Sequence, residues 1–385
     1  MKPSIFLSLL GMLLMSRLFA VSLDISIYND VQKQEIVFRA ISGKYVLLAG
    51  ADTLKPLMKG EEARIVLRTD STFQIYRQGK AGGIYSELRF YGKGFLKAFS
   101  VEIPHSPLRI RNYDDDLFVR IRKGNLQLIN HVDLEHYTAG VVQSEALGSS
   151  KDLQFFLVQA ITCRTYALVN YLKHADEDFN LCDGVHCQYY SGRCRNADIA
   201  RAVARTSGDV IVDENDRMIS AAFHSNCGGQ TVNSEDVWSI PTSYLKSVND
   251  TFCLHQSNAT WRYAMAKDDW LAFLNEHYGY PVDHPKMRIK AYTFQQPERK
   301  LYFEDGIPLK DIRRDLHLRS TFFSLESKKD SVVFHGRGYG HGVGLCQQGA
   351  IRMADLGMDY RKIIEFYYQG TRIIHYSELR YDFMP

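Results

Sequence analysis

The chain has 385 residues, of which 45% are hydrophobic and 12% aromatic, so it has ample material for a buried core and is not a disordered protein. Its formal net charge of +3 is small for this length. The Lys and Arg residues are dispersed rather than gathered into runs, which argues against nucleic acid as a partner. A neutral or mildly acidic polymer fits this surface better.

The first residues have the order of a secretory signal peptide. Lys2 is followed by an apolar run at 5–15, which is too short to span a bilayer comfortably, and then by residues 16–20. We expect residues 1–20 to be removed on export, although cleavage before Ser22 or an uncleaved anchor stays open. No later stretch approaches a membrane span, so the mature chain is expected in the periplasm or cell envelope.

Residues 21–130 are expected to form a β-rich N-terminal domain. Short runs alternate between apolar and polar residues, and Gly, Asp and Lys separate them as hairpin turns require. The runs lie at 25–27, 36–38, 45–48, 65–67, 73–75, 117–121 and 126–128.

From residue 131 onwards the pattern becomes helical. Asp133 is a good N-cap, and apolar residues then recur at helical spacing until Gly148, which places Glu145 in the last turn. Ser150 is expected to cap a second helix, whose apolar face extends to about His174. The two helices predict a hairpin.

The remainder of the chain mixes both kinds of element. A Cys-rich loop at 182–194 precedes strand-like runs at 210–212 and 218–223, and a glycine-dense loop follows Val333. Helices are expected at 347–356 and 359–368, with Gly357 after the first of them. The predicted fold class is therefore α+β, with the β-rich domain followed at 131–385 by a catalytic domain that combines a helical hairpin with β-structure.

Glu145 is the candidate catalytic residue. It ends an apolar helix and is followed by small residues, so its carboxyl is expected at a groove with one apolar wall. Desolvation there would raise its pKa and keep it protonated as a general acid. For an arbitrary glutamate, a solvated helix end would be favoured by roughly ten to one.

Three long segments favour a catalytic role for Glu145 over a solvated helix end. They are VDLEHYTAGVVQSEALGSSKDLQFFLVQAITCRTYAL at 132–168, FHSNCGGQTVNSEDVW at 223–238 and GRGYGHGVGLCQQGA at 336–350. The first resembles the signature of SpoIID/LytB proteins, in which a glutamate closes one helix and an ARTYA-like stretch lies in the next. The other two agree with that family in the right order, and the resemblance covers about 131–374. Cys163, Cys346 and Gln347 depart modestly from the family pattern.

The resemblance implies a lytic transglycosylase that cleaves the MurNAc to GlcNAc bond of peptidoglycan without water and leaves a 1,6-anhydro end. One carboxyl suffices for this chemistry, whereas a hydrolase would normally need a second carboxylate. Asp183 or Glu235 could approach Glu145 in the fold. The resemblance also suggests, weakly, a preference for strands stripped of stem peptides.

Several polar and aromatic residues are candidates for the glycan groove. Arg164 could steady a lactyl carboxylate or an oxyanion, or form a structural ion pair. The alternating glycines at 336–344 allow close approach to a sugar or mark a sharp bend, and no GK[ST] follows them as in a phosphate loop. The predicted substrate-binding residues are Arg164, Tyr166, Gln188, Tyr189, His224, Ser225, Tyr339, His341, Gln347 and Gln348.

His224 and Ser225 could be mistaken for a nucleophile and its base. Adjacent residues on a strand point to opposite faces, so we interpret the pair as ligand hydrogen bonding or as a shaped wall.

The chain has seven cysteines, an odd count, so at least one stays free or pairs outside the chain. Cys163 is the expected free thiol because it lies in an apolar helical pattern.

A zinc ion could be bound tetrahedrally by His174, Cys182, His186 and Cys187, as in some members of the resembled family. The rival is a disulfide between Cys182 and Cys187. Four protein ligands would make the zinc structural, and catalysis is expected to need no cofactor.

Two other classes of protein stay open. The chain could be a non-catalytic peptidoglycan-binding protein or a modifier of a cell-wall amidase, although an intact Glu145 in its helix favours the enzyme. A metal-dependent hydrolase would need an open coordination site, and no HExxH or comparable arrangement supports one.

Overall fold

The computed structural model of the chain describes residues 21–146, 150 and 152–379. It holds 28% helix and 35% strand, which confirms the α+β class. The expected signal peptide at 1–20 and the Gly148 helix end lie outside the described residues. Within the described ranges, no helix has both the length and the apolar character needed to cross a bilayer.

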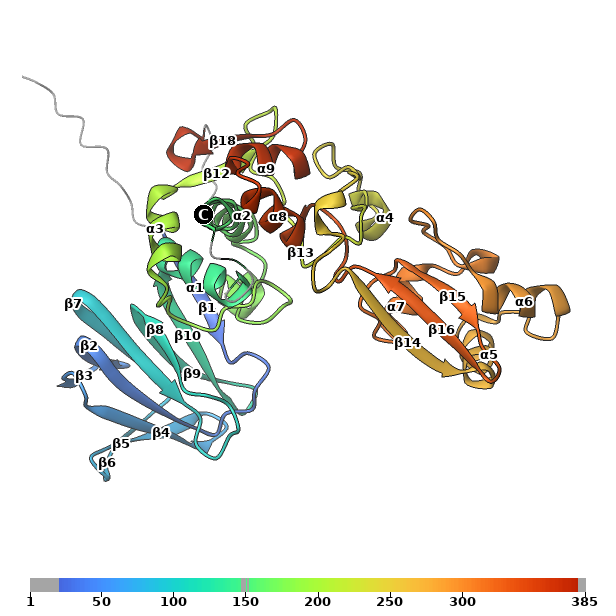
Figure 1. The fold of residues 1–385 in the computed structure, drawn as a ribbon. Helices are drawn as coiled ribbons and strands as arrows, with labels where there is room; N and C mark the ends of the chain where they lie inside the picture. Colours follow the sequence, from blue (N-terminus) through green and yellow to red (C-terminus); the bar gives the residue numbers. More distant parts are fainter. Residues whose placement is uncertain (1–20, 147–149, 151, 380–385) are drawn as a thin grey trace, which may run out of the picture.

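A large mixed sheet forms the N-terminal part of the molecule (Figure 1). Its strand order is β11-β1-β10-β9-β7-β2-β4-β5-β6, with β3 pairing β2 and β8 pairing β7. The strands are β1 (Ser22–Ile27), β2 (Glu35–Ala49), β3 (Asp52–Leu57), β4 (Glu62–Thr69), β5 (Thr72–Arg77), β6 (Lys80–Tyr85), β7 (Glu87–Glu102), β8 (Arg111–Asp114), β9 (Asp116–Arg122), β10 (Asn125–Asp133) and β11 (Leu181–Cys182). Every predicted run falls in one of these strands. The expected domain boundary after residue 130 falls inside β10.

The predicted helical hairpin is α1 (Leu134–Ala146) and α2 (Leu153–Val169). Asp133 caps α1 as expected, because its Oδ1 accepts the N–H groups of Glu135 at 2.8 Å and His136 at 3.3 Å. The expected cap of α2 was wrong: Asp152 is the N-cap and accepts the Gln154 N–H at 2.6 Å. Ser150 lies two residues before this N-cap, where its Oγ accepts the Asp152 N–H at 3.0 Å.

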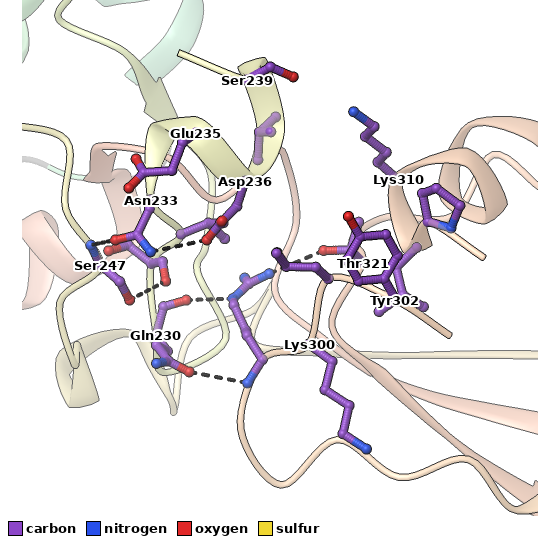
Figure 2. A pocket seen from close by; sticks show the side chains of 17 residues that line it. Gln230, Asn233, Glu235, Asp236, Ser239, Ser247, Lys300, Tyr302, Lys310 and Thr321 are labelled. Atoms are coloured by element: carbon purple, nitrogen blue, oxygen red, sulfur yellow. Dashed lines mark hydrogen bonds between the residues drawn. The ribbon is translucent and has the colours of Figure 1, made fainter. Parts of the chain in front are cut away.

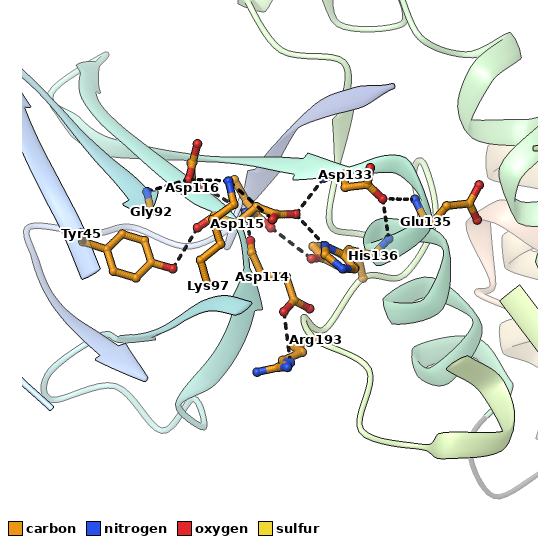
Figure 3. Close-up of polar contacts among 12 residues, drawn as sticks. Tyr45, Gly92, Lys97, Asp114, Asp115, Asp116, Asp133, Glu135, His136 and Arg193 are labelled. Carbon is orange, nitrogen blue, oxygen red and sulfur yellow. Dashed lines mark hydrogen bonds and ion pairs between the residues drawn. The ribbon is translucent and has the colours of Figure 1, made fainter. Parts of the chain in front are cut away.

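A buried acidic residue fixes the start of α1 on the sheet (Figure 3). Asp115, at a left-handed φ of 70°, accepts the Asp133 N–H at 2.9 Å and contacts His136 Nδ1 at 2.8 Å. Burial opposes ionisation of Asp115, but these hydrogen bonds outweigh it and lower its pKa, while the same contact raises the pKa of His136. The charged pair therefore holds the helix that ends near Glu145.

The C-terminal part returns to this core. The expected helices are α8 (Gln347–Asp355) and α9 (Tyr360–Tyr367), and β12 (Asp209–Val212) pairs with β18 (Arg372–His375). The run expected at 218–223 is mostly irregular: only β13 (Phe223–His224) is a strand, in parallel pairing with β17 (Leu345–Cys346). The helices α3 (Ala197–Arg205) and α4 (Ser234–Trp238) complete this part.

Residues 260–337 form a unit that the sequence patterns did not predict, drawn in orange in Figure 1. Its elements are β14 (Thr260–Ala266), α5 (Lys267–Tyr278), α6 (Pro285–Thr293), α7 (Leu309–Asp315), β15 (Phe323–Ser327) and β16 (Ser331–Arg337). They bury their own hydrophobic cluster around Trp270, separate from the main core that joins the large sheet to α1, α2, α8 and α9. At the ends of this unit the Gly338 N–H donates to the Ala259 carbonyl at 2.9 Å, so both ends lie beside the start of the glycine-rich loop.

Candidate active site

A cavity of about 650 Å³ lies among the end of α1, the second half of α2, the Cys-rich loop and the β13–β17 pair. This volume is within the range of small-ligand sites. Its lining residues are Glu145, Tyr166, Asn170, Lys173, Val185, His186, Cys187, Ser220, Ala222, Phe223, His224, Ser225, Trp238, Tyr339, Gly340, His341 and Gln347. All three sequence segments that carry the family resemblance therefore contribute to one cavity.

Glu145 is the only carboxylate among the described residues that line this cavity. Burial raises the pKa of its carboxyl above the ordinary value, and a hydrogen bond from the Tyr189 backbone opposes that shift in part. The Tyr189 N–H donates to Oε1 at 2.9 Å. The direction of the pKa shift agrees with the sequence-based expectation of a protonated carboxyl at a partly apolar wall.

The two acids that could have joined Glu145 lie elsewhere. Asp183 is buried and accepts the Tyr28 N–H at 2.7 Å and an Arg111 N–H at 2.9 Å. Glu235 pairs with Lys246 at 2.7 Å and lines a different cavity. Neither residue lines the Glu145 cavity, so no pair of facing carboxylates is formed there by the described residues.

Tyr166 lines the cavity from α2, and Asn170 and Lys173 line it from the C-cap and the turn that follow Val169. Burial raises the pKa of Tyr166, so its hydroxyl stays protonated. Lys173 Nζ donates to the Tyr166 hydroxyl at 3.3 Å and to the His186 carbonyl at 2.5 Å. Lys173 and Asn170 were not predicted from the sequence. The second helix was expected to extend to about His174, but it ends at Val169, and both residues follow it.

The opposite wall is aromatic. Both ring nitrogens of His341 are bound to backbone: Nε2 donates to the Phe223 carbonyl at 2.9 Å, and Nδ1 accepts the Val343 N–H at 3.1 Å. Burial lowers the pKa of His341 to about 4, so the ring is neutral. Its ring centroid lies 5.3 Å from that of Trp238, which is 43% exposed. His341 therefore offers a ring face rather than a hydrogen bond.

His224 and Gln347 supply unused polar atoms to the same wall. His224 Nδ1 donates to the Val343 carbonyl at 3.1 Å, and burial lowers the pKa of this histidine well below its ordinary value. Its Nε2 and the Gln347 Nε2 are buried, and neither pairs with another group in the described part of the chain. One acceptor and one donor thus remain for a ligand.

The glycine-rich loop packs tightly against His224. Gly340 has a left-handed φ of 116°, and a Cβ added there would come 2.8 Å from the His224 Cβ. The interpretation of the glycines as a sharp bend therefore applies at Gly340, which also lines the cavity.

Four predicted substrate-binding residues do not line the cavity with their side chains. Arg164 is fully buried, and its Nε donates to Glu135 Oε1 at 2.9 Å, so its contacts are those of the structural ion pair. The prediction that Arg164 contacts substrate is therefore corrected. Gln188 is buried against the Tyr137 hydroxyl, at 3.4 Å, and Tyr189 contributes its backbone N–H.

Gln348 is likewise occupied by the protein. Its Oε1 accepts the Asn226 amide at 2.8 Å, and its Nε2 donates to Ser257 Oγ at 2.8 Å. Ser225, in contrast, does line the cavity, as His224 does. Ser225 lies just beyond the end of β13, where strand alternation no longer applies.

A second cavity of about 340 Å³ holds none of the predicted substrate-binding residues (Figure 2). It lies between the segment 230–247 and the unit at 260–337. Arg299 lines this cavity and donates two hydrogen bonds: Nε donates to the Gln230 carbonyl at 2.7 Å, and a guanidinium nitrogen donates to Thr321 Oγ1 at 3.3 Å. Glu235 and Asp236 are its acidic residues.

The four predicted metal ligands come together at the rim of the Glu145 cavity. The donor atoms of His174, Cys182, His186 and Cys187 all lie within 4.8 Å of one another. Cys187 Sγ is 3.4 Å from His174 Nε2 and 3.8 Å from His186 Nδ1. Tetrahedral zinc with nitrogen and sulfur ligands sets its donors roughly 3.3 to 3.8 Å apart.

The surroundings of this cluster also suit a metal. His174 Nδ1 contacts Glu177 Oε1 at 3.0 Å, the carboxylate partner that orients many histidine ligands. Cys182 and Cys187 are both free thiols, and the Cys182 N–H donates to Cys187 Sγ at 3.4 Å. The residues present therefore fit a zinc ion.

Comparison with known proteins agrees with the motifs. Residues 122–212, which include α1, α2 and Glu145, match the family model described as SpoIID, Stage II sporulation protein. The match supports a SpoIID family assignment for this part of the chain.

Three known proteins are similar to this chain over most of its length. Stage II sporulation protein D of Bacillus subtilis is 29% identical over 267 residues, which are 64% of this chain and 76% of that protein. An uncharacterized protein of Brachyspira hyodysenteriae is 28% identical over 333 residues, covering 85% and 89% of the two chains. The Amidase enhancer of Bacillus subtilis is 24% identical over 290 residues, covering 62% of this chain and 40% of that protein.

Proposed function

We propose that this protein is a lytic transglycosylase that cleaves peptidoglycan glycan strands in the cell envelope, after export, with Glu145 as both acid and base. The observation that carries the proposal is a single carboxyl with a raised pKa in a cavity of about 650 Å³ whose other wall is aromatic. The SpoIID family assignment gives the cell wall as the setting.

A single carboxyl can perform the whole reaction. Glu145 first gives its proton to the glycosidic oxygen as the bond from that oxygen to the sugar C1 breaks. The 6-hydroxyl oxygen of the same MurNAc then bonds to C1, and its proton passes to the Glu145 carboxylate. The acid is regenerated, no water is consumed, and the product ends in a 1,6-anhydro ring. A hydrolase would normally place a second carboxylate opposite the first.

The hydrogen bond to Glu145 is suited to this role. The Tyr189 N–H occupies Oε1, so the transferable proton belongs on Oε2. Burial favours the protonated form that must start the reaction, while the N–H stabilises the carboxylate formed in the middle of it. The two effects together let Glu145 act first as the general acid and then as the general base.

The remaining walls are suited to a sugar chain. Trp238 and Tyr339 are 43% and 45% exposed, and their ring faces can pack on the C–H faces of pyranose rings. Among the described residues that line the cavity, Lys173 is the one lysine. We therefore assign the contact with the lactyl carboxylate of MurNAc to Lys173 in place of Arg164. His224 Nε2 and Gln347 Nε2 are free to pair with hydroxyl or amide groups of the glycan.

We further propose that His174, Cys182, His186 and Cys187 hold a structural zinc ion. The ion would fix the loop that contains His186, whose carbonyl accepts from Lys173, and Tyr189, whose N–H binds Glu145. With four protein ligands it would have no open position for chemistry.

The test is mass analysis of products from intact and amidase-stripped peptidoglycan, using wild type, Glu145→Gln and Glu235→Gln. Glu235 is a matched control because it is a glutamate that lines the other cavity. Anhydro-ended products from wild type and Glu235→Gln, but not from Glu145→Gln, are expected. Hydrated reducing ends, or equal products from all three proteins, would contradict the proposal.

A second function is favoured by one relative, the Amidase enhancer, although this chain covers 40% of that protein. In that case the cavity would bind glycan and the chain would stimulate a cell-wall amidase without cutting the strand. Wild type that binds stripped peptidoglycan, releases no anhydro ends and raises the rate of an added amidase would favour this function over the transglycosylase.

A further inference from the structure

A second group of metal-binding side chains lies away from the zinc cluster at the cavity rim. The sulfurs of Cys227, Cys253 and Cys346 and a carboxylate oxygen of Asp250 all lie within 4.8 Å of one another, and all four residues are buried. The sequence patterns did not predict it, because its members are spread over 120 residues of the chain.

The ligand atoms have the spacing of a tetrahedral site. Cys227 Sγ lies 3.3 Å from Cys253 Sγ and 3.3 Å from Asp250 Oδ2. Zinc–sulfur bonds near 2.3 Å and zinc–oxygen bonds near 2.1 Å would set such donors roughly 3.4 to 3.8 Å apart. Small shifts of the side chains would therefore place all four around one ion.

Hydrogen bonds from the surrounding protein support the donor atoms. Cys346 Sγ accepts the backbone N–H groups of Cys227 at 3.3 Å and Gly349 at 3.4 Å. The Tyr367 hydroxyl donates to Asp250 Oδ2 at 2.9 Å. N–H groups directed at sulfur, and a donor directed at a carboxylate ligand, are the contacts that orient metal ligands in known sites.

A bound cation is what would let all four ligands be ionised together. Three thiolates and a carboxylate could not stay ionised together in a buried site without one. Arg299 is the neighbouring cation, but its guanidinium donates to the Cys227 carbonyl oxygen at 2.6 Å rather than to a sulfur. A soft divalent ion would compensate the charge directly, and thiolates select zinc among the common candidates.

We propose that Cys227, Cys253, Cys346 and Asp250 bind a second zinc ion, with a structural role. The ion would join three segments: the chain after β13, the turn at Thr251–Cys253 and the start of α8, of which Cys346 is the N-cap. The proposal concerns binding alone and does not depend on whether Glu145 is catalytic.

The site would also hold one wall of the Glu145 cavity. Gln347 follows Cys346 directly, and Ser225 precedes Cys227 by two residues. Both line the cavity. Loss of the second ion should therefore loosen the wall opposite α2, whereas loss of the first should loosen the loop that carries Tyr189.

The test counts zinc in the full chain after the first cluster has been removed. Wild type should carry two zinc ions per chain, and the double variant Cys182→Ser/Cys187→Ser should keep one. Adding Cys227→Ser or Asp250→Asn should abolish or weaken the remaining binding, whereas Cys194→Ser, a cysteine outside both clusters, should not. Cobalt bound to the double variant should show intense thiolate-to-metal absorption.

The rival chemistry is a disulfide between Cys227 and Cys253. Peptide mapping of the denatured, chelator-treated double variant without reductant would reveal it as a linked pair of peptides. A linked pair, or a double variant that is folded by circular dichroism yet retains no zinc or cobalt, would overturn the proposal. Because this readout uses the double variant with Cys227, Cys253, Cys346 and Asp250 all intact, misfolding of the triple variants cannot obscure it.

Discussion

The backbone N–H of Tyr189 donates to Oε1 of Glu145 at 2.9 Å and thereby joins the Cys-rich loop to the end of α1. The loop contains three of the four predicted zinc ligands, and α1 is fixed at its other end by the Asp115–His136 pair. The position of the carboxyl thus depends on two separate anchors.

Glu145→Gln should lower the rate of glycan cleavage by about 10² to 10⁴-fold, the usual contribution of a general acid. Gln keeps the size of the side chain and can still accept the Tyr189 N–H, so the thermal unfolding temperature should change little at acidic pH. Rates on stripped glycan, with Glu235→Gln as the control, provide the measurement. A variant that keeps the wild-type rate would remove Glu145 from the chemistry.

The raised pKa of Glu145 should appear in the pH dependence of stability. The folded protein binds this proton more tightly than the unfolded chain, so the stabilisation is complete below the unfolded pKa, near 4.5, and is lost as pH rises through the folded value. Gln does not titrate. Glu145→Gln should therefore gain stability relative to wild type as pH rises through that window, as measured by urea unfolding. A difference that stays constant with pH would contradict the shift.

The sequence was sufficient for features that local spacing determines. The cap at Asp133, the last turn that holds Glu145 and the helices at the C-terminus follow from patterns within one or two turns. The error at Arg164 has a physical reason: Arg164 and Tyr166 are two residues apart on α2, which turns them about 200° from each other. Only one of them could face the cavity, and that residue is Tyr166, while Lys173 lines the cavity from the turn after α2.

Features that depend on distant contacts were not accessible in this way. The cluster of Cys227, Cys253 and Cys346 forms only when the β13–β17 pairing brings its segments together. The unit at 260–337 has short strands and helices without a strong period, and its separate core around Trp270 is defined by contacts across the whole unit.

Lys173→Met should raise KM about fivefold, equivalent to ~1 kcal/mol for a partly exposed charged contact, with little change in kcat. The reason is loss of the contact proposed with the lactyl carboxylate. Lys173→Arg should retain most of the affinity because it keeps the charge. Lys362→Met, at an exposed lysine of α9, is the matched control. Equal KM values for Lys173→Met and the control would exclude this contact.

Removal of the proposed zinc at His174, Cys182, His186 and Cys187 should lower kcat more than it raises KM, because the loop that positions Glu145 loses its anchor. His186→Ala is the mildest change, since His186 is exposed while the other three ligands are buried. Metal content and kcat measured on the same preparation provide the test. Full zinc occupancy in His186→Ala, or unchanged kcat in a variant without this ion, would contradict the assigned role.

Arg164→Met should destabilise the fold by about 3 kcal/mol or more, because it leaves Glu135 without its partner in a largely buried site. Glu135 Oε1 also accepts the Gly208 N–H at 3.2 Å, so the pair joins α1 and α2 to the segment before β12. The double variant Arg164→Met/Glu135→Leu should recover part of the loss, since neither charge then stays unpaired. Urea unfolding of the three proteins measures the coupling. A direct role in substrate binding predicts instead that Arg164→Met raises KM while its unfolding curve stays that of wild type.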